Sequence, residues 1–330
     1  MKIIVTGGAG FIGSHLVKKL VNKKHNVIII DNFSNGRKKN LGEYISKVKI
    51  LNIDISKKGK WLKNLKNVDV VFHLAGLADI VPSIQNPLSY FESNVTGTAN
   101  LLTSSIDYKV KKFIYASSAS CYGIAKKLPT KENSKLSVEY PYALTKKMGE
   151  DLVTHWSKVY NIETVSLRLF NVYGPNSRTS GTYGAMFGTF LAQKIANKPY
   201  TVVGNGEQKR DFTYIDDVIN AFYKSINLKG SHIFNVGTGK PTTINHIVKC
   251  LEGNKINVPK RPGEPDETRA DITKIKKIMK WRPQVTIEKG IKNLLKDIDY
   301  WKDAPVWTKS KIKKATKDWF KYLGKNGKIK

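Results

Sequence analysis

The sequence contains little that would support a secreted, membrane-spanning or metal-binding protein. Its 330 residues include only two cysteines, Cys121 and Cys250, which cannot form a disulfide framework and have no metal-ligand spacing around them. No apolar run approaches the about 18 residues of a membrane span. The first residues lead directly into a short apolar strand, not into the longer apolar core of a signal peptide. These absences predict a soluble cytoplasmic protein with no metal and no membrane span.

Acidic residues and arginine are also scarce. There are 57 basic and 26 acidic residues, a net charge of +31, yet only seven of the basic residues are arginine, the usual reader of nucleic-acid bases. The surplus is largest in residues 274–330, which hold 18 basic and five acidic residues. No nucleic-acid recognition motif accompanies this charge. We therefore expect a lysine-rich solvated surface, no specific nucleic-acid partner and only weak, salt-sensitive binding of polyanions.

Short β-branched segments alternate with helical periods in the first half of the chain. Strands are predicted at residues 2–6, 26–30, 47–53, 68–73, 112–116 and 164–169, and helices at 11–21, 87–106 and 142–160. This alternation is typical of an α/β doubly wound parallel sheet, the Rossmann fold. We expect that domain in residues 1–170, with later segments returning to it. A smaller C-terminal α/β substrate lobe, 171–330, would follow and end in a basic helical segment with helices at 287–298 and 312–323.

A glycine-rich turn follows the first predicted strand. Gly7, Gly10 and Gly13 are spaced three residues apart between that strand and a helix. Glycine permits positive φ and lets backbone N–H groups approach a pyrophosphate at the start of the helix. Gly13 also lets the helix pack closely. The spacing is not G-x-G-x-x-G, but its position between a strand and a helix indicates a dinucleotide site.

The end of the second predicted strand indicates which dinucleotide binds. Asp31 follows Gly13 by 18 residues, and a carboxylate at that place accepts hydrogen bonds from the adenosine ribose hydroxyls and repels a 2′-phosphate. NAD is therefore expected in preference to NADP. Asn32, Phe33 and Ser34 continue the predicted cofactor loop, although Arg37 nearby would suit a 2′-phosphate.

A tyrosine and a lysine one helical turn apart indicate the chemistry. Tyr142 and Lys146 are at positions i and i+4, so they lie on one helix face. To act as a base near neutral pH, a tyrosine needs its pKa lowered by about three units, about 4 kcal/mol. An ammonium about 4 Å away at an effective dielectric near 20 supplies about that much, and oxidised nicotinamide would add a second positive charge. Tyr140 would face another side of the helix.

Small polar residues at the end of the fifth predicted strand complete this constellation. Residues 115–123 read Tyr-Ala-Ser-Ser-Ala-Ser-Cys-Tyr-Gly, and ligands of parallel sheets bind at such carboxyl ends of central strands. A serine there can hydrogen-bond both a substrate hydroxyl and the tyrosine oxygen, and Ser118 is favoured over its neighbours. Cys121 has no sequence neighbour that would activate a thiolate, so it is interpreted as a packing residue.

Together these motifs resemble the extended short-chain dehydrogenase/reductase superfamily. The resemblance is carried by the glycine spacing, the serine segment, Tyr142 with Lys146, and the stretch 168–175, Arg-Leu-Phe-Asn-Val-Tyr-Gly-Pro. Within that superfamily the chain is similar to the UDP-glucose 4-epimerase group of NAD-dependent nucleotide-sugar epimerases. The similarity extends from Met1 to about Pro283, and it does not account for the last predicted helices.

The resemblance implies roles for individual residues. Ser118, Tyr142 and Lys146 match the catalytic residues, and the last two also contact the cofactor. The implied NAD-binding residues further include Gly7, Gly10, Phe11, Ile12, Gly13, Asp31, Asn32, Phe33, Ser34, Asp54, Ile55, Leu74, Ala75, Gly76, Asn94 and Phe170. The implied residues for the UDP-sugar are Ser118, Tyr142, Asn171, Arg210, Arg261, Glu264 and Thr268.

Departures from related enzymes narrow the implied reaction. Sugar 4,6-dehydratases carry Thr-Asp-Glu in the serine segment and nucleotide-sugar decarboxylases also need a carboxylate there, whereas residues 118–120 read Ser-Ala-Ser. The resemblance therefore implies a UDP-sugar 4-epimerase that forms a transient 4-keto intermediate, with UDP-glucose and UDP-galactose as substrates. Thr268 occupies the position where a bulky tyrosine accompanies rejection of N-acetyl sugars, so N-acetylhexosamine forms are also expected.

Other functions stay open on the sequence. They are a uronate or pentose epimerase, a ketosugar reductase, and a non-enzymatic protein of the same fold that senses nucleotides or binds polyanions. The resemblance also implies a homodimer in which helices at 86–106 and 142–160 of each copy form a four-helix bundle. Apolar residues beyond a single stripe on these helices favour that pairing: Leu88, Val95, Leu101, Leu102, Met148, Leu152, Trp156 and Val159.

Overall fold

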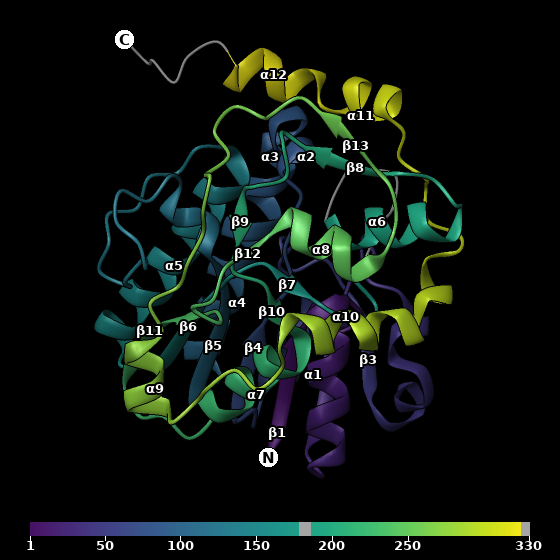
Figure 1. Ribbon diagram of the computed structural model, residues 1–330. Coiled ribbons are helices and arrows are strands. Elements are labelled where there is room, and N and C mark those ends of the chain that lie inside the picture. The colour runs from purple at the N-terminus through teal and green to yellow at the C-terminus, as the bar shows by residue number, and fades with distance from the viewer. Residues whose placement is uncertain (178–185, 325–330) are drawn as a thin grey trace.

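A computed structural model describes residues 1–177 and 186–324, and within this part of the chain a parallel sheet of seven strands forms the centre (Figure 1). The strand order is β11-β6-β5-β4-β1-β2-β3. The strands are β1 (Lys2–Thr6), β2 (Asn26–Asp31), β3 (Lys49–Asn52), β4 (Val70–His73), β5 (Lys112–Ser118), β6 (Glu163–Leu169) and β11 (Ser231–Val236). The predicted doubly wound parallel sheet is confirmed, and its seventh strand, β11, comes from the second half of the chain and pairs with β6.

Helices cover both faces of this sheet because successive side chains of a strand point to opposite sides. Ile3 and Val5 face the core beneath α1 (Phe11–Asn22) and α7 (Ile215–Ser225). Ile4 faces the core beneath α4 (Gly97–Asp107) and α5 (Pro141–Tyr160). Short elements in the connections are η1 (Lys38–Lys47), η2 (Lys60–Leu65), α2 (Ile80–Gln85) and η4 (Ala119–Tyr122).

One of the expected continuous helices contains a π-helical turn but is not interrupted, whereas another is divided, so the prediction of a continuous helix was wrong for the second only. The helix expected at 87–106 consists of α3 (Pro87–Phe91), a π-helical turn η3 (Glu92–Thr96) and α4. Such π turns are common at functional sites. The helix expected at 312–323 consists of α11 (Lys309–Ala315) and α12 (Lys317–Leu323). The Thr316 hydroxyl between them donates to Ile312 O at 2.8 Å, a bond that bends helices.

The apolar residues expected to support a dimer separate into two groups. Val95, Leu101 and Leu102 are buried within the chain itself, so their assignment to a second burial surface was wrong. They are buried because α4 and the π turn pack against α5 and the sheet. By contrast, 74% of Leu88 and 55% of Val159 are exposed, and the dimer stays a prediction that depends on these and neighbouring exposed side chains.

The second half of the chain forms short strand pairs and helices near the carboxyl ends of the sheet strands. The pairs are β7 (Val172–Tyr173) with β10 (Thr213–Tyr214), β8 (Tyr200–Val203) with β13 (Lys255–Val258), and β9 (Lys209–Arg210) with β12 (Thr242–Thr243). The helices are α6 (Met186–Ile195), α8 (Ile244–Leu251), α9 (Thr273–Met279), α10 (Ile287–Lys296) and η5 (Ile298–Trp301). In Figure 1, β8, β13, α6 and α8 lie above the sheet, whose strand β1 starts at the bottom. In the described ranges, none of the helices has the length and apolar character needed to cross a membrane.

Candidate active site

The glycine turn after β1 forms a cradle at the start of α1. Gly7 has a φ of +68°, and a methyl group on it would lie 2.7 Å from the Ala75 nitrogen. A methyl group on Gly13 would lie 2.0 Å from the Gly7 oxygen, so the helix starts in direct contact with the turn. The helix begins after Gly10, and the N–H groups of its first turn have no intrahelical acceptor. This arrangement fits a pyrophosphate, which needs close backbone approach and N–H donors.

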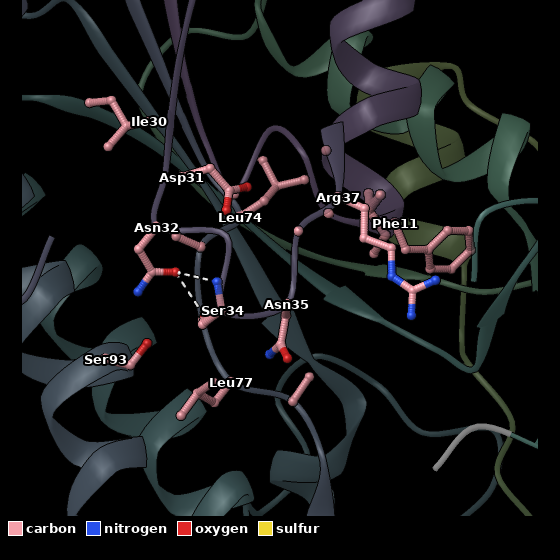
Figure 2. A pocket seen from close by; sticks show the side chains of 18 of the residues that line it. Phe11, Ile30, Asp31, Asn32, Ser34, Asn35, Arg37, Leu74, Leu77 and Ser93 are labelled. Atoms are coloured by element: carbon pink, nitrogen blue, oxygen red, sulfur yellow. Dashed lines mark hydrogen bonds between the residues drawn. The ribbon is translucent and has the colours of Figure 1, made fainter. Parts of the chain in front are cut away.

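A cavity of about 310 Å³ opens from this cradle (Figure 2). Most of the residues predicted to bind NAD line it: Gly7, Gly10, Phe11, Ile12, Gly13, Asp31, Asn32, Ser34, Asp54, Ile55, Leu74, Ala75 and Gly76. Five others, Phe33, Asn94, Tyr142, Lys146 and Phe170, are not among its described lining residues. Figure 2 shows Asn32 and Ser34 on the loop after β2, where Asn32 Oδ1 accepts from the Ser34 N–H at 3.1 Å.

Asp31 is held at the end of β2 with its carboxylate toward the loop. Its Oδ2 accepts from the Ala9 N–H and its Oδ1 from the Phe33 N–H, both at 2.9 Å. Burial raises the pKa of Asp31, and these two hydrogen bonds oppose the rise. A methyl group on Gly36 would lie 2.7 Å from Asp31 Oδ1, so glycine is what lets the loop pass the carboxylate. Each oxygen keeps further acceptor capacity for ribose hydroxyls.

Several cavity residues were missed by the sequence reasoning. Asn35 and Gly36 lie on the predicted loop and could have been found by extending it. Asn176 and Tyr300 also line the cavity, and the Tyr300 hydroxyl donates to Asn40 Oδ1 at 3.0 Å. No local pattern marks these two residues, because they arrive from the second half of the chain.

Asn94 supports the cavity from behind. It lies on the π turn, accepts from the Leu77 N–H at 2.8 Å and donates to Thr145 Oγ1 at 3.0 Å. It therefore connects the loop after β4 to the helix that carries Tyr142. A chain of buried hydrogen bonds also links Thr6, His73 and Thr98 to the Asn94 carbonyl. Burial, with a smaller contribution from the Lys146 charge, lowers the pKa of His73 to about 3. The imidazole is therefore neutral and structural.

Ser118 and Tyr142 meet at the carboxyl end of β5. The Tyr142 hydroxyl is hydrogen-bonded to Ser118 and Ser120, and the two serine oxygens are 2.8 Å apart. Burial raises the pKa of Tyr142 to about 12, and the serine hydrogen bonds oppose that rise. The lowering of this pKa that is expected from Lys146 together with oxidised nicotinamide stays a prediction.

Lys146 lies between the cofactor cavity and the sheet. Its Nζ is 4.7 Å from the centre of the Tyr115 ring and would be 3.9 Å from a methyl group on Gly76. Burial lowers the pKa of Lys146 to about 8, against the attraction of Cys121 and Glu150. An ammonium in this position faces the Gly76 side of the cavity, where the predicted nicotinamide ribose would lie.

The structure also shows where Tyr140 and Cys121, two neighbours of these residues, lie. Tyr140 does not lie on another side of the helix, as expected; it precedes the helix, and its ring stacks on Tyr142 with 6.4 Å between centres and 8° between planes. The residue before Pro141 is held extended, which turns its side chain back toward the next ring. Cys121 is fully buried, and burial raises its pKa to about 12. Its interpretation as an inert packing residue is confirmed.

A buried ion pair near Ser118 and Lys146 was not anticipated from the sequence. Arg168 Nη2 lies 2.6 Å from Glu150 Oε1, and both side chains are almost fully buried. The Ser117 hydroxyl donates to Glu150 Oε2 at 2.6 Å, and Arg168 Nη1 donates to the Tyr122 hydroxyl at 2.7 Å. Glu150 stands one helical turn beyond Lys146, so the pair fixes α5 to the strands that end in Ser118 and Leu169.

Four of the seven residues predicted to bind the substrate line a second cavity, of about 220 Å³, whereas Ser118, Tyr142 and Thr268 are not among its described lining residues. Asn171, Arg210, Arg261 and Glu264 all line it. Glu264 bridges the two arginines, at 2.9 Å from Arg261 Nη1 and 3.9 Å from Arg210 Nη2. The arginine side chains are only 13% and 14% exposed, and a partly buried pair of guanidinium groups suits a diphosphate.

Thr268 is behind this cavity rather than on its described wall. Its hydroxyl lies 3.2 Å from Asn171 Oδ1 and accepts from the Asp211 N–H at 3.1 Å. Asn171 itself adopts a φ of +28°, a conformation that is uncommon outside glycine and often marks functional sites. Thr268 therefore contacts the cavity through Asn171, and its effect on sugar selection stays a prediction.

Comparison with known proteins identifies the class to which this fold and site belong. Residues 3–237 match the model of the NAD dependent epimerase/dehydratase family. The chain therefore belongs to that family of NAD-dependent enzymes. In the same comparisons it is 36% identical over 301 residues to a putative UDP-glucose 4-epimerase of Methanocaldococcus jannaschii, covering 89% of this chain and 97% of the relative. It is also 31% identical to UDP-glucuronic acid decarboxylase 2 of Arabidopsis thaliana, over 90% of this chain and 68% of the relative.

Solved structures give the same family. UDP-glucose 4-epimerase of Thermotoga maritima, with UDP-glucose, matches with a TM-score of 0.84 and 32% identity over 92% of this chain and 99% of that one. UDP-N-acetylglucosamine 4-epimerase of Methanobrevibacter ruminantium matches with a TM-score of 0.84 and 30% identity over 90% and 98%. UDP-glucuronic acid 4-epimerase of Bacillus cereus, in complex with UDP-glucuronic acid and NAD, matches with a TM-score of 0.83 and 33% identity over 92% and 99%.

Proposed function

We propose that the protein is an NAD-dependent 4-epimerase of a UDP-sugar. The observation that carries the proposal is the position of Tyr142, which is hydrogen-bonded to Ser118, stacks on Tyr140 and precedes Lys146 by one turn of the same helix. Lys146 lies toward the cavity that fits a dinucleotide, and Tyr140 lies within electrostatic range of Glu264 and Arg210 in the other. A base whose immediate neighbours reach toward a dinucleotide site and a diphosphate site suits hydride transfer at a sugar carbon.

NAD, when bound, supplies the hydride acceptor and donor for the sugar C4. The protein's own residues do the rest. Tyr142, as the phenolate, takes the proton of the 4-hydroxyl and later returns it, while Ser118 orients that hydroxyl. Lys146 provides positive charge near Tyr142, and this charge would oppose the rise in the Tyr142 pKa that burial causes. Arg210 and Arg261 hold the diphosphate, about which the transient 4-keto sugar turns before the opposite face is reduced.

The relatives include both 4-epimerases and a decarboxylase, so the reaction of this protein has to be decided by experiment. Decarboxylation would require an acid beside the sugar, and residues 118–120, Ser-Ala-Ser, contain none. That absence favours epimerisation over decarboxylation. The relatives and neighbours named for UDP-glucose, UDP-N-acetylglucosamine and UDP-glucuronic acid define the sugars to compare.

The test incubates the purified protein separately with UDP-glucose, UDP-galactose, UDP-N-acetylglucosamine and UDP-glucuronic acid, and identifies the products by NMR. We expect interconversion at C4 with no net change in the redox state of added NAD. Tyr142→Phe should lower turnover by about 10²–10⁴-fold while NAD affinity stays the same, because only the proton acceptor is lost. Release of CO₂, or stoichiometric reduction or oxidation of the dinucleotide, would contradict the proposal.

A further inference from the structure

We infer that Trp319, in the short helix α12, is a positioning residue for Arg261. Through Trp319, α12 holds in place the loop that binds the diphosphate of the substrate. The inference rests on the proposed function, since it assumes that Arg261 binds the diphosphate of a UDP-sugar. It concerns the basic C-terminal segment, for which the sequence resemblance implies no role.

Trp319 is docked on the loop that carries the substrate residues. Only 2% of its surface is exposed. The indole N–H donates to Pro262 O at 2.8 Å, and the Arg261 guanidinium lies over the indole ring, 5.2 Å from its centre. A helix of seven residues has no stability of its own in water, so α12 exists because this side chain is buried there.

A second set of contacts attaches α12 to the other side of the active site. Asp318 accepts a hydrogen bond of 2.8 Å from Gln85, at the end of α2. The Trp319 ring also lies 6.4 Å from the ring of Tyr140, which stacks on Tyr142. Figure 1 shows α12 across the top of the molecule, close to α2 and α3. The helix therefore bridges the residues around the catalytic tyrosine and the loop that carries Arg261 and Glu264.

The contact explains how an indole can restrict the conformation of an arginine before a phosphate binds to it. A guanidinium over an aromatic ring is attracted by the ring's electrons, and its N–H donors lie in its own plane. This contact restricts the rotamers of Arg261, and it needs no hydrogen bond from the donors that a phosphate would use. Arg261 already uses one donor for Glu264, at 2.9 Å. The side chain is thus held on two sides before the ligand binds, and less ordering entropy is lost on binding.

The experiment compares ligand affinities of full-length variants by calorimetry. We expect Trp319→Leu to weaken binding of UDP by about tenfold, and to weaken binding of UMP much less, because Arg261 acts on the diphosphate. NAD affinity and kcat at saturating UDP-sugar should stay close to wild type, while KM rises. Trp319→Phe keeps an aromatic ring but not the N–H donor, so its affinity for UDP should lie between those of the wild type and Trp319→Leu. Tyr322→Leu is the matched control, since Tyr322 lies on the same helix and is 59% exposed, and it should bind UDP as the wild type does.

The outcomes separate this inference from the proposed function. If the wild type does not bind UDP, the proposed function fails. If the wild type binds UDP and Trp319→Leu binds it equally well, only the inference is overturned. Equal losses for UDP, UMP and NAD would also overturn it, because they indicate a general loss of structure. If Trp319→Leu does not fold, Gln85→Ala is measured instead, because it removes the hydrogen bond that attaches α12 to α2. If Gln85→Ala and Trp319→Phe, measured as separate variants, both bind UDP as the wild type does, the inference is overturned.

Discussion

Replacement of Glu150 by glutamine should destabilise the protein far more than any change at its surface. The side chains of Glu150 and Arg168 are 3% and 4% exposed, and Arg168 Nε and Nη2 both donate to the carboxylate, at 2.6–3.2 Å. Burial disfavours the charged guanidinium, yet the hydrogen bonds and charge of Glu150 raise the pKa of Arg168. Glu150→Gln therefore leaves a buried cation without its counter-charge.

The expected magnitude follows from the burial of the pair. Breaking a buried ion pair on one side costs about 3–5 kcal/mol, a large part of the about 5–15 kcal/mol by which a protein is stable. At about 2–4 °C per kcal/mol for larger domains, the melting temperature should fall by roughly 6–20 °C. Catalysis should fall too, because Glu150 also accepts the hydrogen bond of Ser117, the neighbour of Ser118.

The assay is thermal unfolding of matched variants, with epimerase turnover measured in parallel. Asp151→Asn is the control: Asp151 lies on the same helix and pairs with Lys147 at 2.5 Å, but that pair is exposed and contributes at most about 0.5 kcal/mol. Glu150→Leu combined with Arg168→Met removes both charges and should be much more stable than either single variant. A loss below about 1 kcal/mol in Glu150→Gln, or additive losses in the double variant, would refute the reasoning.

NAD should bind the wild-type protein at least tenfold more tightly than NADP. In a binding titration, Asp31→Ser should lower this ratio of affinities. Equal affinities for NAD and NADP in the wild type would show that Asp31 does not select the cofactor. Thr268→Tyr should reduce turnover of UDP-N-acetylglucosamine relative to UDP-glucose, because an added ring beside Asn171 fills the cavity at a cost of about 1–3 kcal/mol; an unchanged ratio contradicts this. The wild type should sediment as a dimer at micromolar concentration and Leu88→Glu as a monomer, since Leu88 is 74% exposed on α3; a monomeric wild type would exclude the bundle. Lys146 has a pKa of about 8 in the folded chain and 10.5 in the unfolded one, so the unfolded chain binds more protons between these values and the stability of the wild type rises with pH across that window. Lys146→Met should therefore melt at a higher temperature than wild type at pH 7, and this advantage should shrink at pH 10; an advantage that does not depend on pH would argue against a buried ammonium.

Local steric and chemical requirements made part of the site predictable from the sequence. The turn at Gly7 and Gly13 could be found because a close backbone approach admits no other residue, and the structure places any added methyl group at 2.7 and 2.0 Å from its neighbours. Asp31 could be found because the end of a second strand has a fixed place in a doubly wound sheet. Tyr142 and Lys146 could be paired because a helix sets the geometry of i and i+4. Each of these inferences needs only neighbours in sequence.

Only the tertiary structure decided what depends on burial and on distant segments. Tyr300 lines the cofactor cavity from the second half of the chain, and Trp319 docks beside Arg261 from the C-terminal helix. Desolvation by the surrounding core raises the pKa of Tyr142, and the hydrogen bonds of Ser118 and Ser120 oppose that rise. Glu150 and Arg168 look like surface residues in a sequence, since charged side chains are rarely buried unless paired, and their pairing joins elements that no local pattern connects. Spacing along the chain therefore determined which groups could be predicted to carry the chemistry. Packing determined the direction of their pKa shifts and the contacts that hold them in place.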